Sequence, residues 1–224
     1  MDPHKQTLQT YFDGPGFARW QAIYGEGELS RVRATIRAGH ERMLATAAAW
    51  LGEHRTGTML DAGCGTGLFA VAMAERGWQV TAVDIAPQMA GATAARAEAA
   101  GMAERVTALA GDLEAATGEH DAAVCFDVLI HYDAAALGPM LSGLAARSRG
   151  PVLFTYAPHT PVLGALAWLG DKFPKGERRT DVKLIRRTML DAALAGAGLR
   201  EVQRASVRSG FYYVELVETA RIDD

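Results

Sequence analysis

The chain has 224 residues, 49% of them hydrophobic and 22% charged, which suits one large domain with a buried core and leaves too little length for two. Its 23 Lys and Arg against 26 Asp and Glu give a net charge of -3, which argues against a nucleic-acid partner. The polar residues 1–5 lack the layout of a secretory signal, and the longest apolar stretch, 161–169, is roughly half of a membrane-spanning helix. We therefore expect a cytoplasmic protein.

The N-terminal residues 1–55 are predicted to be helical. Ser30 is a typical N-cap, and apolar residues recur after it at a helical period as far as Gly52. Aromatic residues crowd the part before Ser30. We expect residues 1–55 to form a helical cap and substrate lid over a catalytic domain comprising residues 56–224. The alternative for the aromatic residues is a cap that only packs on the sheet.

From residue 56 onward, short apolar strands alternate with amphipathic helices. The predicted strands are 58–60, 79–83, 106–109, 122–126 and 152–156. The predicted helices are 66–76, 87–100, 134–147, 162–169 and 188–197. The alternation predicts an α/β fold with a doubly wound, mostly parallel sheet and helices on both faces. Residues 199–207 and 211–217 predict a closing antiparallel hairpin, which a plain dinucleotide-binding fold lacks.

The loop between the first predicted strand and its helix contains an acid followed by glycines at every second position. The acid is Asp61, and the glycines are Gly63, Gly65 and Gly67. Glycines let the backbone turn tightly and approach a ligand that a Cβ would block. A second acid, Asp84, follows the next predicted strand at the spacing that reaches ribose hydroxyls, and Ile85 comes after it. These residues predict a Rossmann-like cofactor site.

Two cofactor classes compete for this loop. A dinucleotide site would place its third glycine where this chain has Leu68, and Asp61 would repel the pyrophosphate. The same carboxylate attracts the ammonium group of S-adenosylmethionine. The spacing Asp-x-Gly-x-Gly-x-Gly resembles the first motif of class I methyltransferases, whose fold usually ends in such a hairpin. This resemblance implies S-adenosylmethionine as the cofactor and S-adenosylhomocysteine as its product.

The same resemblance implies roles for residues after the third and fourth strands. Asp112 and Leu113 resemble the family's adenine-binding pair, with the carboxylate accepting from the exocyclic amine and the leucine packing on the ring. Phe126 would border the methionine part of the cofactor. The open alternatives are a helix N-cap for Asp112 and a core aromatic residue for Phe126.

Segments outside the core pattern are more specific. Residues 11–12, 16–20, 23–25, 127–132, 154–158 and 173–174 together resemble the magnesium-protoporphyrin O-methyltransferases of chlorophyll and bacteriochlorophyll synthesis. The resemblance covers nearly the whole chain and implies methyl transfer to one propionate of magnesium protoporphyrin IX. The magnesium is then carried by the substrate. Six histidines without an HxxxH pair and two cysteines without CxxC spacing agree with a protein that binds no metal itself.

The resemblance also implies acceptor residues and partners. We expect His131 and Tyr24 to orient the propionate or to take a residual proton, and Tyr132 and Arg19 to contact the substrate. The alternatives are a structural histidine and a core tyrosine. The large porphyrin-binding subunit of magnesium chelatase is an implied partner, and the basic stretch 172–187 is a candidate for peripheral contact with the photosynthetic membrane.

Three rival functions stay open at this point. One is a class I methyltransferase for another planar small molecule, and another is a nucleotide-binding module without catalysis. The third is a dinucleotide oxidoreductase, which Asp61 and Leu68 disfavour. A polar residue after the fourth strand, His131, disfavours the module without catalysis.

Overall fold

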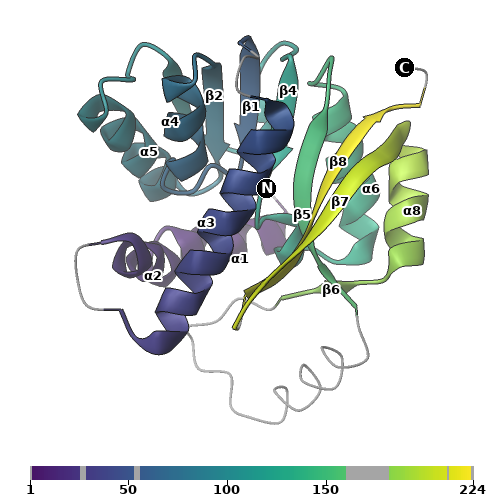
Figure 1. The fold of residues 1–224 in the computed structure, drawn as a ribbon, viewed down its shortest axis with the longest axis horizontal. Helices are drawn as coiled ribbons and strands as arrows, with labels where there is room; N and C mark the ends of the chain where they lie inside the picture. Colours follow the sequence, from purple (N-terminus) through teal and green to yellow (C-terminus); the bar gives the residue numbers. More distant parts are fainter. Residues whose placement is uncertain (1, 26–28, 53–55, 160–181, 211, 223–224) are drawn as a thin grey trace.

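The computed structural model describes residues 2–25, 29–52, 56–159, 182–210 and 212–222. Within them, eight strands form a sheet in the order β3-β2-β1-β4-β5-β8-β7, with β6 paired to β5 (Figure 1). The strands are β1 (Thr58–Ala62), β2 (Gln79–Asp84), β3 (Val106–Ala110), β4 (Ala122–Cys125), β5 (Val152–Pro158), β6 (Leu184–Ile185), β7 (Leu199–Ser209) and β8 (Tyr212–Arg221). Strands β1 to β6 pair in parallel, whereas β8 runs antiparallel to β5 and β7. The predicted sheet and its closing hairpin are confirmed.

The described helices follow the predicted alternation. They are α1 (Pro3–Phe12), α2 (Pro15–Tyr24), α3 (Arg31–Leu51), α4 (Leu68–Glu75), α5 (Pro87–Ala99), α6 (Ala134–Ala145) and α8 (Arg187–Gly196), with short 3-10 turns η1 (Leu113–Ala115) and η2 (Leu129–His131). Ser30 caps α3 as predicted, by accepting from the Arg33 amide at 3.4 Å. Helix α4 begins at Leu68 rather than at residue 66, because Gly67 has a left-handed φ of 77°. The predicted helix 162–169 lies outside the described residues.

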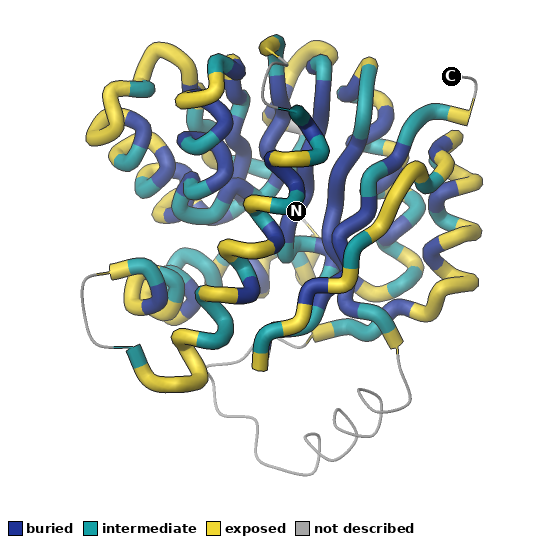
Figure 2. Tube along the Cα trace, in the orientation of Figure 1, coloured by how far each residue is buried: buried dark blue, intermediate teal, exposed yellow. Residues whose placement is uncertain are grey.

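Two clusters of buried apolar side chains pack the helices on opposite faces of the sheet. One cluster joins α3, α4 and α5 to the sheet through residues such as Met43, Phe69 and Ala97. The other joins α6 and α8 through Leu141 and Leu190. In Figure 2 the strands between these layers are mostly buried, while the outer sides of the helices are exposed. No helix in the described part of the chain combines the length and apolarity needed to cross a bilayer.

The N-terminal helices lie at the carboxyl edge of the parallel strands. Gln9 of α1 donates from Nε2 to the carbonyl of Ile85, just after β2, at 3.0 Å. Helix α3 crosses the sheet and reaches the β7–β8 hairpin (Figure 1), where a Cβ at Gly39 would overlap the ring of Tyr212. Glycine at this position lets the helix approach β8 closely. This close approach brings His40, the next residue of α3, to the carboxyl edge of the sheet.

Candidate active site

A cavity lies where the glycine loop, the N-terminal helices and the ends of the parallel strands meet. Its walls are the loop 61–66, residues 83–85 at the end of β2, residues 111–113, and residues 125–128 with the end of η2. The N-terminal helices complete it with the side chains of Leu8, Phe12, Trp20, His40 and Leu44. Ligands of open α/β sheets bind at this edge.

The glycine loop is held in a shape that only glycine adopts easily. Gly63 has a φ of 83°, and a Cβ there would overlap Cγ2 of Val128. Arg96 of α5 supports the loop by donating from Nε to the carbonyl of Thr66 at 2.7 Å. A Cβ at Gly65 would meet nothing within 4 Å. The loop is therefore tightly packed at Gly63 and open at Gly65, where it lines the cavity.

Asp84 ties the glycine loop to the end of β2. Its Oδ2 accepts from the Gly65 amide and its Oδ1 from the Ala86 amide, each at 2.9 Å. Burial raises the pKa of this carboxyl, and the two amide hydrogen bonds lower it in part. Each oxygen retains a lone pair, so the carboxylate can also accept from a pair of ligand hydroxyls in the cavity that it lines.

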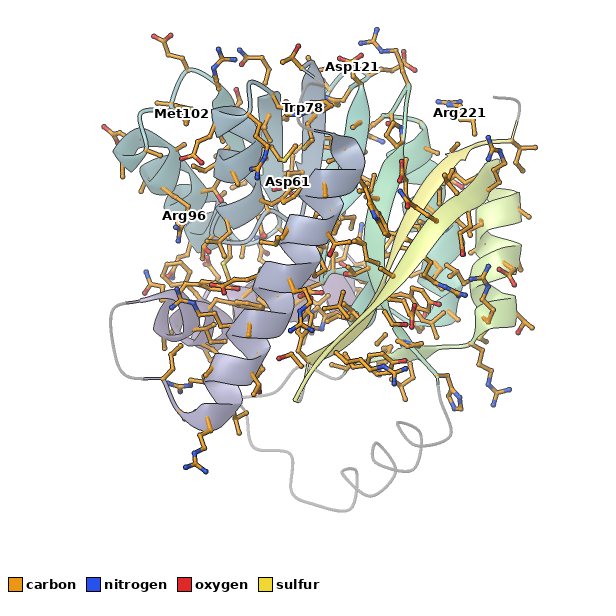
Figure 3. The ribbon with its side chains drawn as sticks, viewed as in Figure 1. Asp61, Trp78, Arg96, Met102, Asp121 and Arg221 are labelled. Carbon is orange, nitrogen blue, oxygen red and sulfur yellow. The ribbon has the colours of Figure 1, made fainter. Side chains whose placement is uncertain are left out.

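Asp61 is the most informative residue of the loop. It is 2% exposed, and within the described residues nothing donates to its Oδ2 (Figure 3 labels it near the carboxyl end of β1). Burial, followed by the nearby Asp84, raises the pKa of Asp61 from its ordinary 3.8 to about 7. A buried carboxylate oxygen without a donor is costly until a ligand supplies one. The ammonium group of S-adenosylmethionine meets that requirement, so the residues present fit this cofactor.

Asp112 and Leu113, the predicted adenine-binding pair, line the cavity, and Asp112 also has a structural role. Oδ1 of Asp112 accepts from the Leu113 amide at 2.8 Å and caps η1, as the N-cap alternative expects. Its Oδ2 pairs with the ammonium of Lys5 from α1, and both Asp112 and Leu113 line the cavity. Phe126 also combines two positions, because it packs edge-on against Phe69 with ring centroids 5.0 Å apart and lines the cavity.

His131 and Tyr132 lie in the opposite wall, among residues of α1. His131 is 8% exposed and lines the cavity, with its ring 5.2 Å from that of Phe12. The carbonyl of His131 accepts from Nε2 of His4 at 2.9 Å. Tyr132 also lines the cavity, and burial, followed by the charge of Asp112, raises its pKa to about 12. The predicted acceptor side is thus brought together with the predicted cofactor side in one cavity.

Two predicted residues lie elsewhere. Neither Tyr24 nor Arg19 is among the described residues that line the cavity, and Arg19 is exposed. The Tyr24 hydroxyl instead contacts Nδ1 of His40, and His40 is the residue that faces the cavity. Burial raises the pKa of Tyr24 above its ordinary 10.0, with smaller contributions from Glu41 and Asp127. Tyr24 therefore lies behind the wall, one residue removed from a ligand.

The sequence alone did not single out His40 or Lys5. Both lie on helices, where no short motif marks them. Trp20 and Asp127 lie in the segments 16–20 and 127–132 that carry the family resemblance, without a role of their own assigned there. Among the described residues, no group of three or more His, Cys, Asp or Glu is placed to hold a metal ion.

These features define the class of protein. A buried carboxylate with one oxygen that no described residue pairs lies beside a glycine loop, on a parallel sheet that closes with the β7–β8 hairpin. This is the cofactor half of a class I S-adenosylmethionine-dependent methyltransferase. The family model described as a methyltransferase domain matches residues 59–148, and the one described as the magnesium-protoporphyrin IX methyltransferase C-terminus matches residues 125–221. The chain belongs to the magnesium-protoporphyrin O-methyltransferase family.

Relatives match over almost the whole chain. The magnesium-protoporphyrin O-methyltransferase of Rhodobacter capsulatus is 35% identical over 223 residues, covering 96% of this chain and 95% of that protein. The chloroplastic magnesium protoporphyrin IX methyltransferase of Arabidopsis thaliana is 34% identical, covering 96% of this chain and 70% of that protein. The crystal structure of magnesium protoporphyrin IX methyltransferase from Synechocystis PCC 6803, with bound S-adenosylhomocysteine, matches with a TM-score of 0.87 and 30% identity. The match covers 97% of this chain and 99% of that one.

Proposed function

We propose that this protein transfers a methyl group from S-adenosylmethionine to a propionate carboxylate of magnesium protoporphyrin IX, giving the monomethyl ester in chlorophyll or bacteriochlorophyll synthesis. One observation carries the proposal: a single cavity joins the carboxylates Asp61 and Asp84 to an aromatic wall made by Phe12, Trp20 and Tyr132. A flat macrocycle needs such a wall. Family membership over almost the full length supports the same acceptor.

The residues of the cavity divide the work of holding the cofactor. We assign the ammonium group to Asp61, the ribose hydroxyls to Asp84 with Ile85 beside them, and the adenine to Asp112 and Leu113. Phe126 borders the methionine part. When bound, the cofactor supplies a methyl group on a sulfonium, and the electron pair of the broken carbon–sulfur bond stays on the sulfur.

The acceptor makes few chemical demands on the protein. A propionic acid has a pKa near ~4–5 and is ionised at neutral pH, so its oxygen attacks the methyl carbon without a general base. The tasks of the chain are positioning and exclusion of water. We assign the positioning of the carboxylate to His131 in the cavity wall and to Tyr24 behind it. Tyr132 contacts the macrocycle, and Arg19, which is exposed, stays a prediction for its outer rim.

Three wider proposals follow from the same substrate. Residues 1–55 act as the lid of the acceptor site, and residues 56–224 as the catalytic domain. The large porphyrin-binding subunit of magnesium chelatase delivers the porphyrin, which suits a poorly soluble substrate. The basic stretch 172–187, of which residues 172–181 lie outside the described residues, contacts the anionic surface of the photosynthetic membrane.

Turnover with two porphyrins tests the function. Purified protein should convert S-adenosylmethionine to S-adenosylhomocysteine only when a porphyrin is added, with the metal-free form at least ~10-fold lower in kcat/KM. The reacting carboxylate is several bonds from the magnesium, so any preference for the metal comes from binding that places the propionate. Equal rates would withdraw the magnesium-specific assignment. No turnover with either porphyrin would favour another planar acceptor.

A further inference from the structure

His40 of α3 lines the cavity, and the proposed mechanism gives it no role. Its Nδ1 contacts the Tyr24 hydroxyl, and its Nε2 lies 3.9 Å from Oδ2 of Asp127. The indole of Trp20 packs against the imidazole, with ring centroids 5.2 Å apart. The distance to Asp127 is too long for a hydrogen bond, yet short enough for strong attraction between charges. His40 thus bridges the hidden Tyr24 and a carboxylate that faces the cavity.

Asp127 is fixed in place. It is the one non-glycine residue among those described with a positive φ, at 56°, a conformation that is strained for a residue with a Cβ. The hydroxyl of Tyr212 donates to both of its oxygens at 3.0 and 3.1 Å, and Thr155 donates to Oδ1 at 3.1 Å. Both donors are neutral. Strain of this kind persists where the surroundings enforce it and is common at functional sites.

A fixed carboxylate in this wall poses a problem for an acceptor that is itself a carboxylate. Like charges at a few ångströms in a cavity of low dielectric repel by several kcal/mol. Lys5 already pairs with Asp112, on the cofactor side. Among the described residues, the titratable or charged groups that act on His40 or on its Tyr24 contact are Tyr24 on α2, Arg37 and Glu41 on α3, Arg96 on α5, Asp127 after β4 and Tyr212 on β8. Arg37 pairs with Glu41 on the outer side.

We propose that His40 takes up a proton when the acceptor carboxylate enters, a step that rests on the proposed function. Charged His40 offsets the repulsion from Asp127. Its Nδ1–H then donates to the Tyr24 oxygen, so the Tyr24 hydroxyl no longer donates to His40. The proton comes from solvent and returns to it when the neutral ester leaves, so the cycle balances. His40 is a positioning residue in this scheme, because it acts through Asp127 and Tyr24.

The burial of His40 determines whether acceptor binding takes up or releases a proton. Desolvation lowers the pKa of His40 below its ordinary 6.5, against smaller opposing effects of Asp127 and Glu41. The ligand-free protein therefore holds His40 neutral at pH 7 and above. An incoming anion raises this pKa, so acceptor binding consumes a proton and weakens as pH rises. The KM for the porphyrin should increase with pH while cofactor affinity follows a different profile.

Calorimetry with magnesium protoporphyrin IX and bound S-adenosylhomocysteine measures the proton directly. In two buffers of different ionisation enthalpy near pH 7.5, the wild-type binding enthalpy should differ by an amount that reports proton uptake. The difference should vanish in His40→Gln and persist in His131→Gln. The porphyrin KM should rise about fivefold or more between pH 6.5 and 8.5 in the wild type, as expected for a histidine-linked step. The profile should be flat in His40→Gln.

Two further variants complete the design. His120→Gln removes a buried histidine that precedes β4, at the opposite edge of the sheet, and should leave the uptake unchanged. Asp127→Asn keeps the shape of the side chain and removes the charge, so it should reduce the uptake even if His40→Gln does not fold. If the binding enthalpy does not depend on the buffer in a wild-type protein that turns over, the role of His40 is overturned and the proposed function stands. Absent turnover would instead count against the proposed function.

Discussion

The two halves of the cavity are built in different ways. The cofactor half consists of backbone amides and carboxylates on loops that follow consecutive parallel strands, with Asp61, Asp84 and Asp112 each near a strand end. The acceptor half consists of aromatic and imidazole side chains from α1 to α3 and η2, such as Phe12, His40 and His131. Loops at strand ends are positioned by the sheet itself, whereas the acceptor half depends on how separate helices dock. We therefore expect the first half to be common to class I methyltransferases and the second to determine the choice of substrate.

The two halves of the cavity also differ in the charge of the ligand that each is expected to bind. Asp61 is a buried carboxylate whose Oδ2 has no donor among the described residues, and its raised pKa means that a cation must be bound at the expense of a proton. His40 is a buried imidazole with a lowered pKa, which gains a proton when an anion arrives. Cofactor binding is thus expected to release a proton and acceptor binding to consume one.

The largest effect is expected where the two halves touch. A Cβ in Gly63→Ala would overlap Val128 and strain a φ of 83°. Because Val128 precedes η2, any shift reaches His131 as well. We expect cofactor affinity to fall at least ~100-fold, about 3 kcal/mol, measured by calorimetry. The matched control is Gly91→Ala in α5, where a Cβ meets nothing within 4 Å and helix propensity favours alanine. Equal affinity in both variants would contradict the packed loop.

Removing His131 tests the acceptor half alone. His131→Ala should lower kcat by ~10²-fold or more through loss of a positioned hydrogen-bonding group, with S-adenosylmethionine affinity little changed. Steady-state kinetics and calorimetry on the same preparation separate the two. Near-normal turnover would assign His131 to structure, and a parallel loss of cofactor affinity would show that the halves are not separable at this residue.

Removing Asp84 tests the cofactor half alone. Asp84→Ala should weaken S-adenosylmethionine binding by ~1–3 kcal/mol, because charged hydrogen bonds to ligand hydroxyls are lost. The control is Asp133→Ala, which removes an exposed carboxylate that likewise accepts two backbone amides, those of Ala135 and Ala136. That variant should lose helix stability and retain cofactor affinity. Unchanged affinity in folded Asp84→Ala would remove Asp84 from the site.

The smallest effect is a pH dependence. The pKa of Asp61 is raised to about 7, so below that pH the protonated carboxyl must ionise before it attracts the ammonium group. The ionised fraction of Asp61 rises from ~3% at pH 5.5 to ~50% at pH 7, so cofactor affinity should rise about 15-fold over this range, where α-amino groups stay protonated. Asp61→Asn should bind more weakly and lose this slope. A wild-type affinity that is flat across the same range would mean that the cofactor contacts Asp61 in neither form.

The sequence predicted the fold, and it predicted cofactor residues that the fold brings to one edge of the sheet. Strand–helix alternation fixes the order of the elements, and parallel strands bring their carboxyl ends to one edge whatever the helices do. The glycines and Asp84 were identifiable because backbone conformation dictates residue type at fixed spacing. One detail of the fold differed, the start of α4 at Leu68, and Asp112 takes the capping role that the sequence had left open as an alternative.

The acceptor half was decided by tertiary structure. Tyr24 and Arg19 were expected at the substrate, yet the docking of α2 turns Tyr24 behind His40 and leaves Arg19 exposed. No spacing in the sequence links His40 to Asp127, because the contact exists only after α3 crosses the sheet and Gly39 packs on Tyr212. Backbone-made sites follow from local sequence, since one turn of chain supplies their geometry. Sites made of side chains from separate helices follow only from packing, which the sequence encodes through the whole core at once.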